Sequence, residues 1–254
     1  MVSRHPSIAF RETTKLFGEV TAVDAISLEI EDDSFVALVG ESGSGKSTLL
    51  KTINRLVDPD SGSVLMEGED VRCADAPELR RRIGYVFQGV GLFPHMDVAE
   101  NIAIGPRLSG TRLPGERIEE LLAGVELDGS YASRMPSELS GGQRQRIGVA
   151  RALANDPHIL LMDEPFGALD PVTRDALGKR VRALHDRLGL TTVMVTHDMA
   201  EALLLADRVL VMSEGRLAAD RTPKQLLAGE GGEIAQSLVA VPRDQAEALA
   251  GLVG

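Results

Sequence analysis

The chain has 254 residues, one cysteine and a formal net charge of −11, from 27 basic and 38 acidic side chains. This length suits one core with an inserted subdomain, and the acidic balance argues against broad nucleic-acid binding, which depends on basic side chains. The single Cys73 excludes an intrachain disulfide and a cysteine-cluster metal site. No apolar run approaches the roughly 20 residues of a membrane span, and residues 1–6 are not followed by the apolar segment of a secretory signal.

The first predicted element is an N-terminal antiparallel β layer. Ile26, Leu28 and Ile30 alternate with Ser27 and Glu29. A period of two is typical of a strand with one buried face.

A phosphate-binding loop follows. Residues 35–39 form a short apolar run that predicts a buried strand, and residues 48–53 predict a helix. The connecting loop fits the pattern G-x-x-x-x-G-K-[ST], in which backbone N–H groups hold phosphates, a lysine reaches the terminal ones and a hydroxyl ligates magnesium. An ordinary glycine- and serine-rich turn is the alternative, but the correct spacing of the lysine and the serine argues against it. The loop and the residue after it comprise Gly40, Glu41, Ser42, Gly43, Ser44, Gly45, Lys46, Ser47 and Thr48.

The middle of the chain, residues 89–151, has a helical pattern. Asp97 and Glu100 have the spacing of a capping box. Further on, Ser140 and two glycines open an apparent helix, which makes a second N-terminus suited to an anion. We expect this stretch to form a helical subdomain.

Two later strands each end in a polar side chain. Residues 158–162 predict a buried strand followed by Asp163 and Glu164, and residues 192–196 predict another followed by His197. Ligands bind at the carboxyl ends of strands in open α/β sheets. Asp163 can therefore hold magnesium, Glu164 can orient or deprotonate the attacking water, and His197 can contact the γ-phosphate. A helix-capping Asp-Glu pair and a solvated histidine are the alternatives.

The chain end carries weaker signals. Thr222 and Pro223 have the order of a helix cap and a first-turn proline, and residues 229–232 predict a flexible joint. The predicted organisation is one domain over residues 1–254. Its nucleotide-binding core comprises residues 1–88 and 152–215, its helical subdomain residues 89–151, and its short C-terminal extension residues 216–254.

These motifs resemble those of the ATP-binding subunits of ABC transporters. Residues 139–143 read LSGGQ, which matches the signature of that family letter for letter, and residues 144–153 also fit. Gln88 matches the Q-loop glutamine, Asp170 the D-loop aspartate and His197 the switch histidine. Phe17 falls where the family places an aromatic ring that stacks on adenine, although one aromatic can also be a core residue.

The resemblance implies an α/β P-loop ATPase that uses ATP and Mg²⁺. It implies catalytic roles for Glu164, His197 and Gln88, and magnesium ligands at Ser47, Gln88 and Asp163. The signature of one copy is expected to complete the nucleotide site of a second copy, so two chains enclose two ATP molecules. The implied nucleotide contacts outside the phosphate loop are Phe17, Ser140, Gly141, Gly142, Gln143 and Asp170.

The resemblance extends to importers of osmoprotectants. Residues 88–96 and the helix start after them are similar to subunits that serve glycine betaine, choline or carnitine import, although Asp97 replaces a threonine often found there. His95 reads as a loop residue near a partner rather than a metal ligand. The expected partners are permease subunits, indirectly a solute-binding protein, and a second copy, but no nucleic acid. The expected location is the cytoplasm, on the inner face of the cell membrane.

Other functions within the same family stay open. The cassette can serve a different small solute, such as an amino acid, or an exporter. Non-transport ABC ATPases of DNA repair or chromosome structure have cassettes split by coiled coils or zinc-binding cysteines, and translation-associated ones have two cassettes with a basic linker. This sequence has none of these features.

Overall fold

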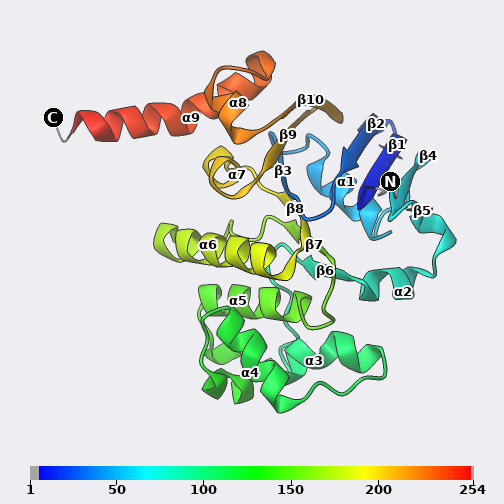
Figure 1. The fold of residues 1–254 in the computed structure, drawn as a ribbon, viewed down its shortest axis with the longest axis vertical. Helices are drawn as coiled ribbons and strands as arrows, with labels where there is room; N and C mark the ends of the chain where they lie inside the picture. The colour runs from blue at the N-terminus through cyan, green and yellow to red at the C-terminus, as the bar shows by residue number, and fades with distance from the viewer. Residues whose placement is uncertain (1–5, 253–254) are drawn as a thin grey trace, which may run out of the picture. The chain divides into compact units, whose positions relative to one another are not determined.

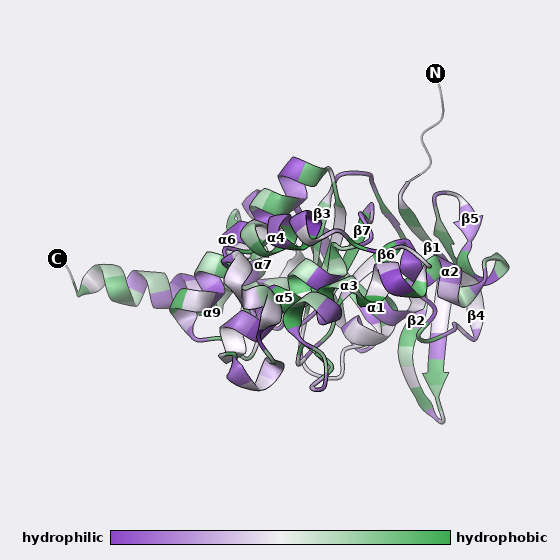
Figure 2. Cartoon of the chain, turned by 90° about the horizontal axis from the view of Figure 1, so that it is seen from below, coloured by the Kyte–Doolittle hydropathy of each residue, from purple (hydrophilic) through white to green (hydrophobic). Residues whose placement is uncertain are grey.

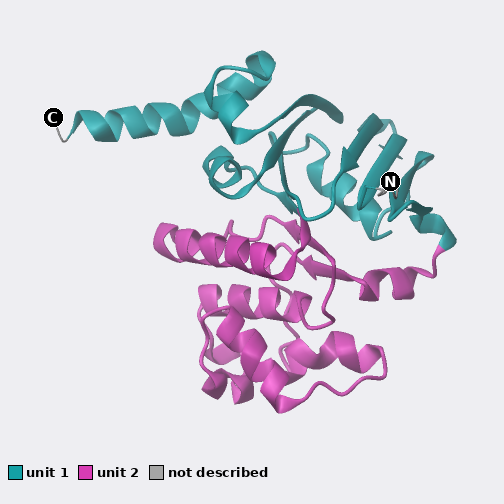
Figure 3. Cartoon of the chain, viewed as in Figure 1, with its two compact units in different colours: residues 1–73, 193–254 teal, residues 74–192 magenta. Residues whose placement is uncertain are grey.

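The computed structural model describes residues 6–252, and Figure 1 shows its helices and strands. The chain divides into two compact units (Figure 3), one formed by residues 1–73 and 193–254 and the other by residues 74–192. The expected absence of a secretory signal concerns residues 1–6, which lie outside the described part except for Pro6. Within residues 6–252, no helix has the length and apolarity that a bilayer span requires.

The first unit contains a four-stranded antiparallel sheet in the order β2-β1-β4-β5. In β2, Ile26, Leu28 and Ile30 are buried while Ser27 and Glu29 are exposed, which confirms the alternation expected from the sequence. The strands are β1 (Ile8–Phe17), β2 (Val20–Ile30), β4 (Ser61–Met66) and β5 (Glu69–Asp70), and a short 3-10 helix, η1 (Val71–Cys73), follows them.

The same unit also contains the strands that carry the phosphate-binding loop. β3 (Phe35–Val39) is fully buried and pairs in parallel with β9 (Arg208–Ser213), which pairs antiparallel with β10 (Arg216–Arg221). Thr196, directly after β8 (Thr191–Val195), donates its N–H to the carbonyl of Leu38 on β3. The helices of this unit are α1 (Lys46–Ile53), α7 (Met199–Leu205), α8 (Pro223–Leu227) and α9 (Gly232–Gly251).

The second unit combines a parallel strand pair with helices. β6 (Ile83–Val86) pairs with β7 (Ile159–Asp163), and the segment between them is the helical stretch expected from the sequence. Its first nine residues, 89–97, are not helical. The helices are α2 (Ala76–Arg81), α3 (Val98–Leu108), α4 (Gly115–Gly124), η2 (Gly129–Ser133), η3 (Pro136–Glu138), α5 (Gly141–Ala152) and α6 (Pro171–Leu188).

The predicted α/β fold, with an antiparallel β layer and mixed, mainly parallel strands, is confirmed. Local capping signals are confirmed as well. Asp97 and Glu100 form a capping box at α3, and Thr222 caps α8, which begins at Pro223. α9 begins at Gly232, the last residue of the predicted flexible joint, and hydrophobic and hydrophilic residues alternate along it (Figure 2).

Candidate functional site

The phosphate-binding loop joins β3 to α1, and two of its glycines are required by close backbone contacts. Gly40 has φ 153° and Gly45 has φ 99°, both in the region that disfavours other residues. A Cβ atom at Gly40 would lie 2.1 Å from the carbonyl oxygen of Met212, and one at Gly45 would lie 2.0 Å from that of Ala22. Only glycine therefore fits at these two positions.

Lys46 is almost completely buried within this loop. Its Nζ atom donates hydrogen bonds to the carbonyl oxygens of Gly40, at 2.8 Å, and Glu41, at 2.6 Å, and to Ser44 Oγ at 3.2 Å. The loop thus places a cation beside the start of α1, where Gly45 is the N-cap and supplies no side-chain acceptor. The backbone N–H groups of a helix start and a nearby cation both favour an anion.

The other residues of the loop differ in exposure. Glu41, Ser42 and Gly43 are exposed, whereas Ser47 and Thr48 are partly buried in the first turn of α1. The loop tip is therefore accessible to a ligand, while the Ser47 hydroxyl lies on a regular helix that fixes its backbone.

His197 follows β8 at the carboxyl end of the strands of the first unit. Thr196 is bonded to β3 through Leu38, two residues before the phosphate-binding loop begins. The Thr196 hydroxyl donates to Glu201 Oε2 at 2.6 Å and accepts from the Asp198 N–H at 3.0 Å. His197 is exposed and lies between these two anchored neighbours.

Phe17 ends β1 with about half of its surface, 51%, exposed, so the interpretation of Phe17 as a core residue is wrong. Lys15 Nζ lies 5.3 Å from the centre of its ring. An exposed aromatic face is what stacking on a base requires.

In the second unit, three predicted site residues lie at one end of the β6–β7 pair. Val86 pairs with Met162, so Gln88 and Glu164 each follow two residues later, and Gln88 Nε2 donates to Glu164 Oε2 at 3.1 Å. Asp163 is the last residue of β7 and is 2% exposed. The helix-capping alternative is wrong, because neither acidic residue is the N-cap of α6.

The surroundings of the two carboxylates differ. The Tyr85 hydroxyl donates to Asp163 Oδ2 at 3.4 Å, and burial, together with the negative charge of Asp163, raises the pKa of Tyr85 far above its ordinary value. Tyr85 therefore stays a donor to Asp163. Glu164 has φ 46°, a left-handed conformation that costs free energy in a residue with a side chain and recurs at functional sites.

The signature residues line a cavity of about 490 Å³ in the second unit. Ser140 caps α5, and its Oγ accepts from the Gln143 N–H at 3.2 Å in a capping box. Asp170 caps α6 at the same cavity, and a Cβ atom at Gly142 would lie 2.7 Å from Thr173 Cγ2, so the two helix starts pack closely.

The cavity also contains residues that sequence reasoning missed. Tyr131 accepts a hydrogen bond from Gln143 Nε2 at 2.9 Å, and Arg146 forms an ion pair with Glu126 at 3.1 Å. No motif marks Glu126 and Tyr131, which reach the cavity through tertiary packing, whereas Arg146 lies in the stretch that continues the signature. Across residues 6–252, no group of three or more His, Cys, Asp or Glu side chains is arranged to hold a metal ion.

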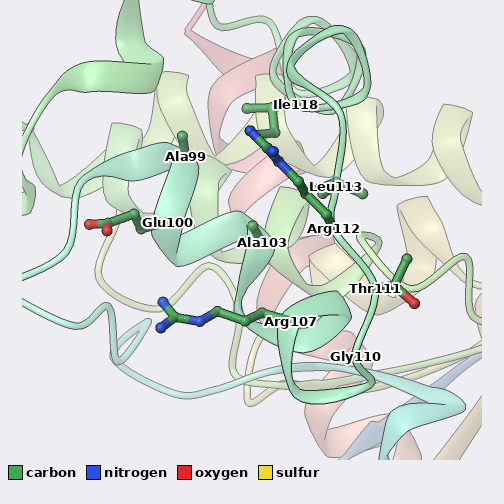
Figure 4. Close-up of a pocket in the computed structure, with 9 residues that line it drawn as sticks. All are labelled: Ala99, Glu100, Ala103, Arg107, Gly110, Thr111, Arg112, Leu113 and Ile118. Carbon is green, nitrogen blue, oxygen red and sulfur yellow. The ribbon is translucent and has the colours of Figure 1, made fainter.

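A second cavity, of about 450 Å³, lies between α3 and the segment that leads into α4 (Figure 4). Its lining is mostly small or apolar, with charges from Glu100, Arg107 and Arg112. The residues are Ala99, Glu100, Ala103, Arg107, Gly110, Thr111, Arg112, Leu113 and Ile118.

The loop before α3 is fixed by the buried amide of Asn101. This amide accepts from the Phe93 N–H at 2.8 Å and donates to the carbonyls of Phe93, at 3.1 Å, and Met96, at 3.0 Å. The Phe93 side chain is nevertheless exposed, as is that of His95. An ordered loop thus presents an apolar ring to solvent.

Together, the buried lysine in a glycine loop, the strand-end carboxylates and the serine-capped glycine helix define a P-loop nucleotide hydrolase. The profile of the ABC transporter family matches residues 23–167, and the chain belongs to that family. It is therefore an ATP-binding cassette with ATPase activity.

Three ATP-binding subunits of importers are similar to this chain. The chain is 51% identical to the glycine betaine uptake system ATP-binding protein YehX of Escherichia coli, over 87% of this chain and 72% of that protein. It is 50% identical to the sulfate/thiosulfate import ATP-binding protein CysA of Caulobacter vibrioides, with coverages of 87% and 66%. It is 44% identical to the glycine betaine/carnitine/choline transport ATP-binding protein OpuCA of Bacillus subtilis, with coverages of 93% and 63%. The chain thus spans about two thirds of the length of these relatives.

A solved structure supports the fold. The ATP-binding cassette MJ0796, in a dimeric post-hydrolysis state bound to ADP and Pi, superposes with a TM-score of 0.77 at 34% identity. The match covers 85% of this chain and 98% of that one.

Proposed function

We propose that this chain is the ATP-hydrolysing subunit of an ABC importer for quaternary-amine osmoprotectants such as glycine betaine, choline or carnitine. The observation that carries the proposal is a full set of nucleotide-handling residues in a chain 51% identical to a glycine betaine uptake subunit. Its partners are permease subunits and, through them, a solute-binding protein. Its place is the inner face of the cell membrane, held there by the permease.

In this proposal, the phosphate-binding loop of the first unit holds the phosphates of ATP. Lys46 contacts the terminal phosphates, residues 40–48 supply backbone N–H groups and hydroxyls, and Phe17 stacks on the adenine. His197 contacts the γ-phosphate. The burial of Lys46 and the half exposure of Phe17 support these roles.

The residues present fit a magnesium ion. Mg²⁺ prefers oxygen ligands and is usually held by one or two carboxylates together with substrate phosphates. Ser47, Asp163 and Gln88 offer a hydroxyl, a carboxylate and an amide oxygen. When bound, the ion neutralises charge on the phosphates. Glu164 then orients and deprotonates the attacking water.

The signature residues act on the nucleotide of a second copy. Ser140, Gly141, Gly142 and Gln143 open α5 beside a cavity that Asp170 also lines, and a helix start with a serine hydroxyl suits a phosphate. The dimeric state of the structurally similar cassette supports a head-to-tail dimer that encloses nucleotide.

The permease docks on the surface formed by residues 88–96 and the cavity beside α3. Two observations support this partner: the exposed Phe93 on a loop that Asn101 holds rigid, and an adjoining cavity with two arginines. The surface also contains Gln88, which bonds to Glu164, so a movement of the permease can reach the hydrolysis residues.

A sulfate or thiosulfate importer is the second candidate, because CysA is nearly as similar as YehX. An exporter is a further possibility within the family. The neighbouring genes distinguish import from export, because a gene for a solute-binding protein beside the permease gene indicates import.

Uptake by a deletion strain without redundant systems tests the substrate. We expect ATP-dependent uptake of labelled glycine betaine, choline or carnitine to be lost and sulfate uptake to be unchanged. In the assembled transporter, Gln88→Ala should leave uptake uncoupled from hydrolysis. Normal uptake of all three amines would refute the substrate, and a protein that purifies with ribosomes or DNA rather than a permease would refute the transporter role.

A further inference from the structure

The loop that contains Gln88 has an unusual backbone. Gly89, Val90 and Gly91 follow one another with φ values of 79°, 65° and 55°. For Val90, a β-branched residue, this left-handed conformation is strained and persists only where the surroundings impose it. Something outside the loop must therefore hold these residues in place.

Arg151, in the last turn of α5, provides that restraint. Its guanidinium donates to the carbonyl oxygen of Val90 at 2.5 Å and to that of Gly91 at 2.8 Å. The same group lies 6.0 Å from the centre of the Phe87 ring, just before Gln88. A planar guanidinium presents several N–H donors in a fixed fork, so it fixes two successive carbonyls at once.

Arg151 is substantially buried, and burial lowers the pKa of its guanidinium below the ordinary value. Its two carbonyl acceptors compensate part of the lost hydration.

The side chain of the strained residue, Val90, also packs on α5. A Cβ atom at Gly148 would lie 2.9 Å from Val90 Cγ1, which shows how closely the valine side chain packs on α5. Val90 is 8% exposed. Near its C-terminal end α5 thus contacts both the backbone and the side chain of the loop, while its N-terminal end begins at the signature serine, Ser140.

We propose that Arg151 is a positioning residue that sets Gln88 against Glu164 and ties this position to the signature helix. The inference rests on the proposed roles of Gln88 and Glu164 in ATP hydrolysis. In this arrangement, Gln88 donates to Glu164 only while the loop is held to α5. A shift of the signature end of α5 therefore moves the side-chain amide of Gln88 relative to Glu164, the proposed base.

Arg151→Lys in the full-length chain tests the proposal. Lysine keeps the charge but is a single flexible point donor, so it does not fix both carbonyls. We expect kcat for ATP hydrolysis to fall about tenfold with KM and ATP affinity unchanged, in the range found for residues that couple sites without touching ligand. We also expect faster hydrogen exchange at the amides of Val90 and Gly91, which bond within the loop.

Arg180→Lys is the matched control. Arg180, on α6, also donates to two successive carbonyls, those of Gly124 at 2.6 Å and Ala123 at 3.1 Å, but these belong to the end of α4. This variant should change neither kcat nor exchange in the Q-loop. Gly148→Ala acts on the same loop by displacing Val90, and it replaces Arg151→Lys if that variant does not fold.

A double variant tests whether Arg151 acts through Gln88. If Arg151 acts through Gln88, then Arg151→Lys should cause no further loss of kcat in a Gln88→Ala background. Equal losses in both backgrounds, or no loss from Arg151→Lys alone, would overturn the inference and leave the proposed function intact. If Gln88→Ala itself leaves kcat unchanged, this inference falls, whereas the loss of coupling between uptake and hydrolysis expected from Gln88→Ala remains a separate test of the proposed function.

Discussion

Glu164→Gln removes a carboxylate while it keeps the size and reach of the side chain. Glu164 Oε2 accepts from Gln88 Nε2 at 3.1 Å, and the carbonyl oxygen of a glutamine can accept from the same donor. The backbone strain at φ 46° applies equally to both residue types. We therefore expect the free energy of unfolding to change by less than about 1 kcal/mol, a small effect for a single substitution.

The expected effect on hydrolysis is far larger. A general base contributes about 10²–10⁴-fold to a rate, which corresponds to roughly 2.7–5.4 kcal/mol of activation free energy. Binding of ATP should stay unchanged, since Lys46 and its loop are untouched. Phosphate release at saturating ATP and equilibrium nucleotide binding measure the two effects separately. Glu116→Gln, at an exposed position of α4, is the control for loss of a carboxylate. Turnover within about tenfold of the unmodified chain would refute Glu164 as the base.

Further predictions concern Lys46, Ser140 and Asp170. Lys46→Ala should weaken ATP binding itself, because it removes the buried cation of the phosphate loop, and unchanged affinity in a titration would contradict this. The Glu164→Gln chain should sediment as a dimer with ATP and Mg²⁺ and as a monomer without them. Mixing Lys46→Ala with Ser140→Arg chains should restore activity, because one site of the mixed dimer carries both lesions and the other carries none. A persistent monomer or an inactive mixture would argue against the shared site. Asp170→Ala should lower the melting temperature by removing the cap of α6. Hydrogen bonds, first from the Thr173 side chain, lower the pKa of Asp170, so its contribution is present above the unfolded-state pKa and is lost as pH falls through the lower folded-state value. The difference between variant and unmodified chain should therefore shrink in acid, and a difference that grows would contradict the assignment.

Much of this architecture was readable from the sequence because the decisive signals are local. The strand before Gly40, the helix after it and the spacing of Lys46 all depend on residues within one short segment. The caps at Asp97 and Thr222 were predictable for the same reason, since a cap needs only a side chain and a backbone N–H three residues away.

Other features depend on contacts that no short segment encodes. No turn signal in the sequence marks the left-handed φ of Glu164. The hydrogen bond from Arg151 to the Val90 carbonyl joins residues 61 positions apart. Sequence reasoning made no prediction for α9, which contains Pro242 and follows glycines, both of which normally argue against a helix. Its buried Ala235 and Val239, four residues apart, were the signal in its favour.

The close approach of the phosphate loop to Ala22 and Met212 has a consequence for the order of folding during synthesis. The two glycines approach main-chain carbonyls of β2, which precedes residues 74–192 in the sequence, and of β9, which follows them. The loop therefore has both of these neighbours only after β9 has left the ribosome. A nascent chain that ends before Met212 has the complete G-x-x-x-x-G-K-[ST] motif but lacks one wall of its site. During synthesis the phosphate loop therefore lacks one of its two backbone neighbours until residue 212 has been added.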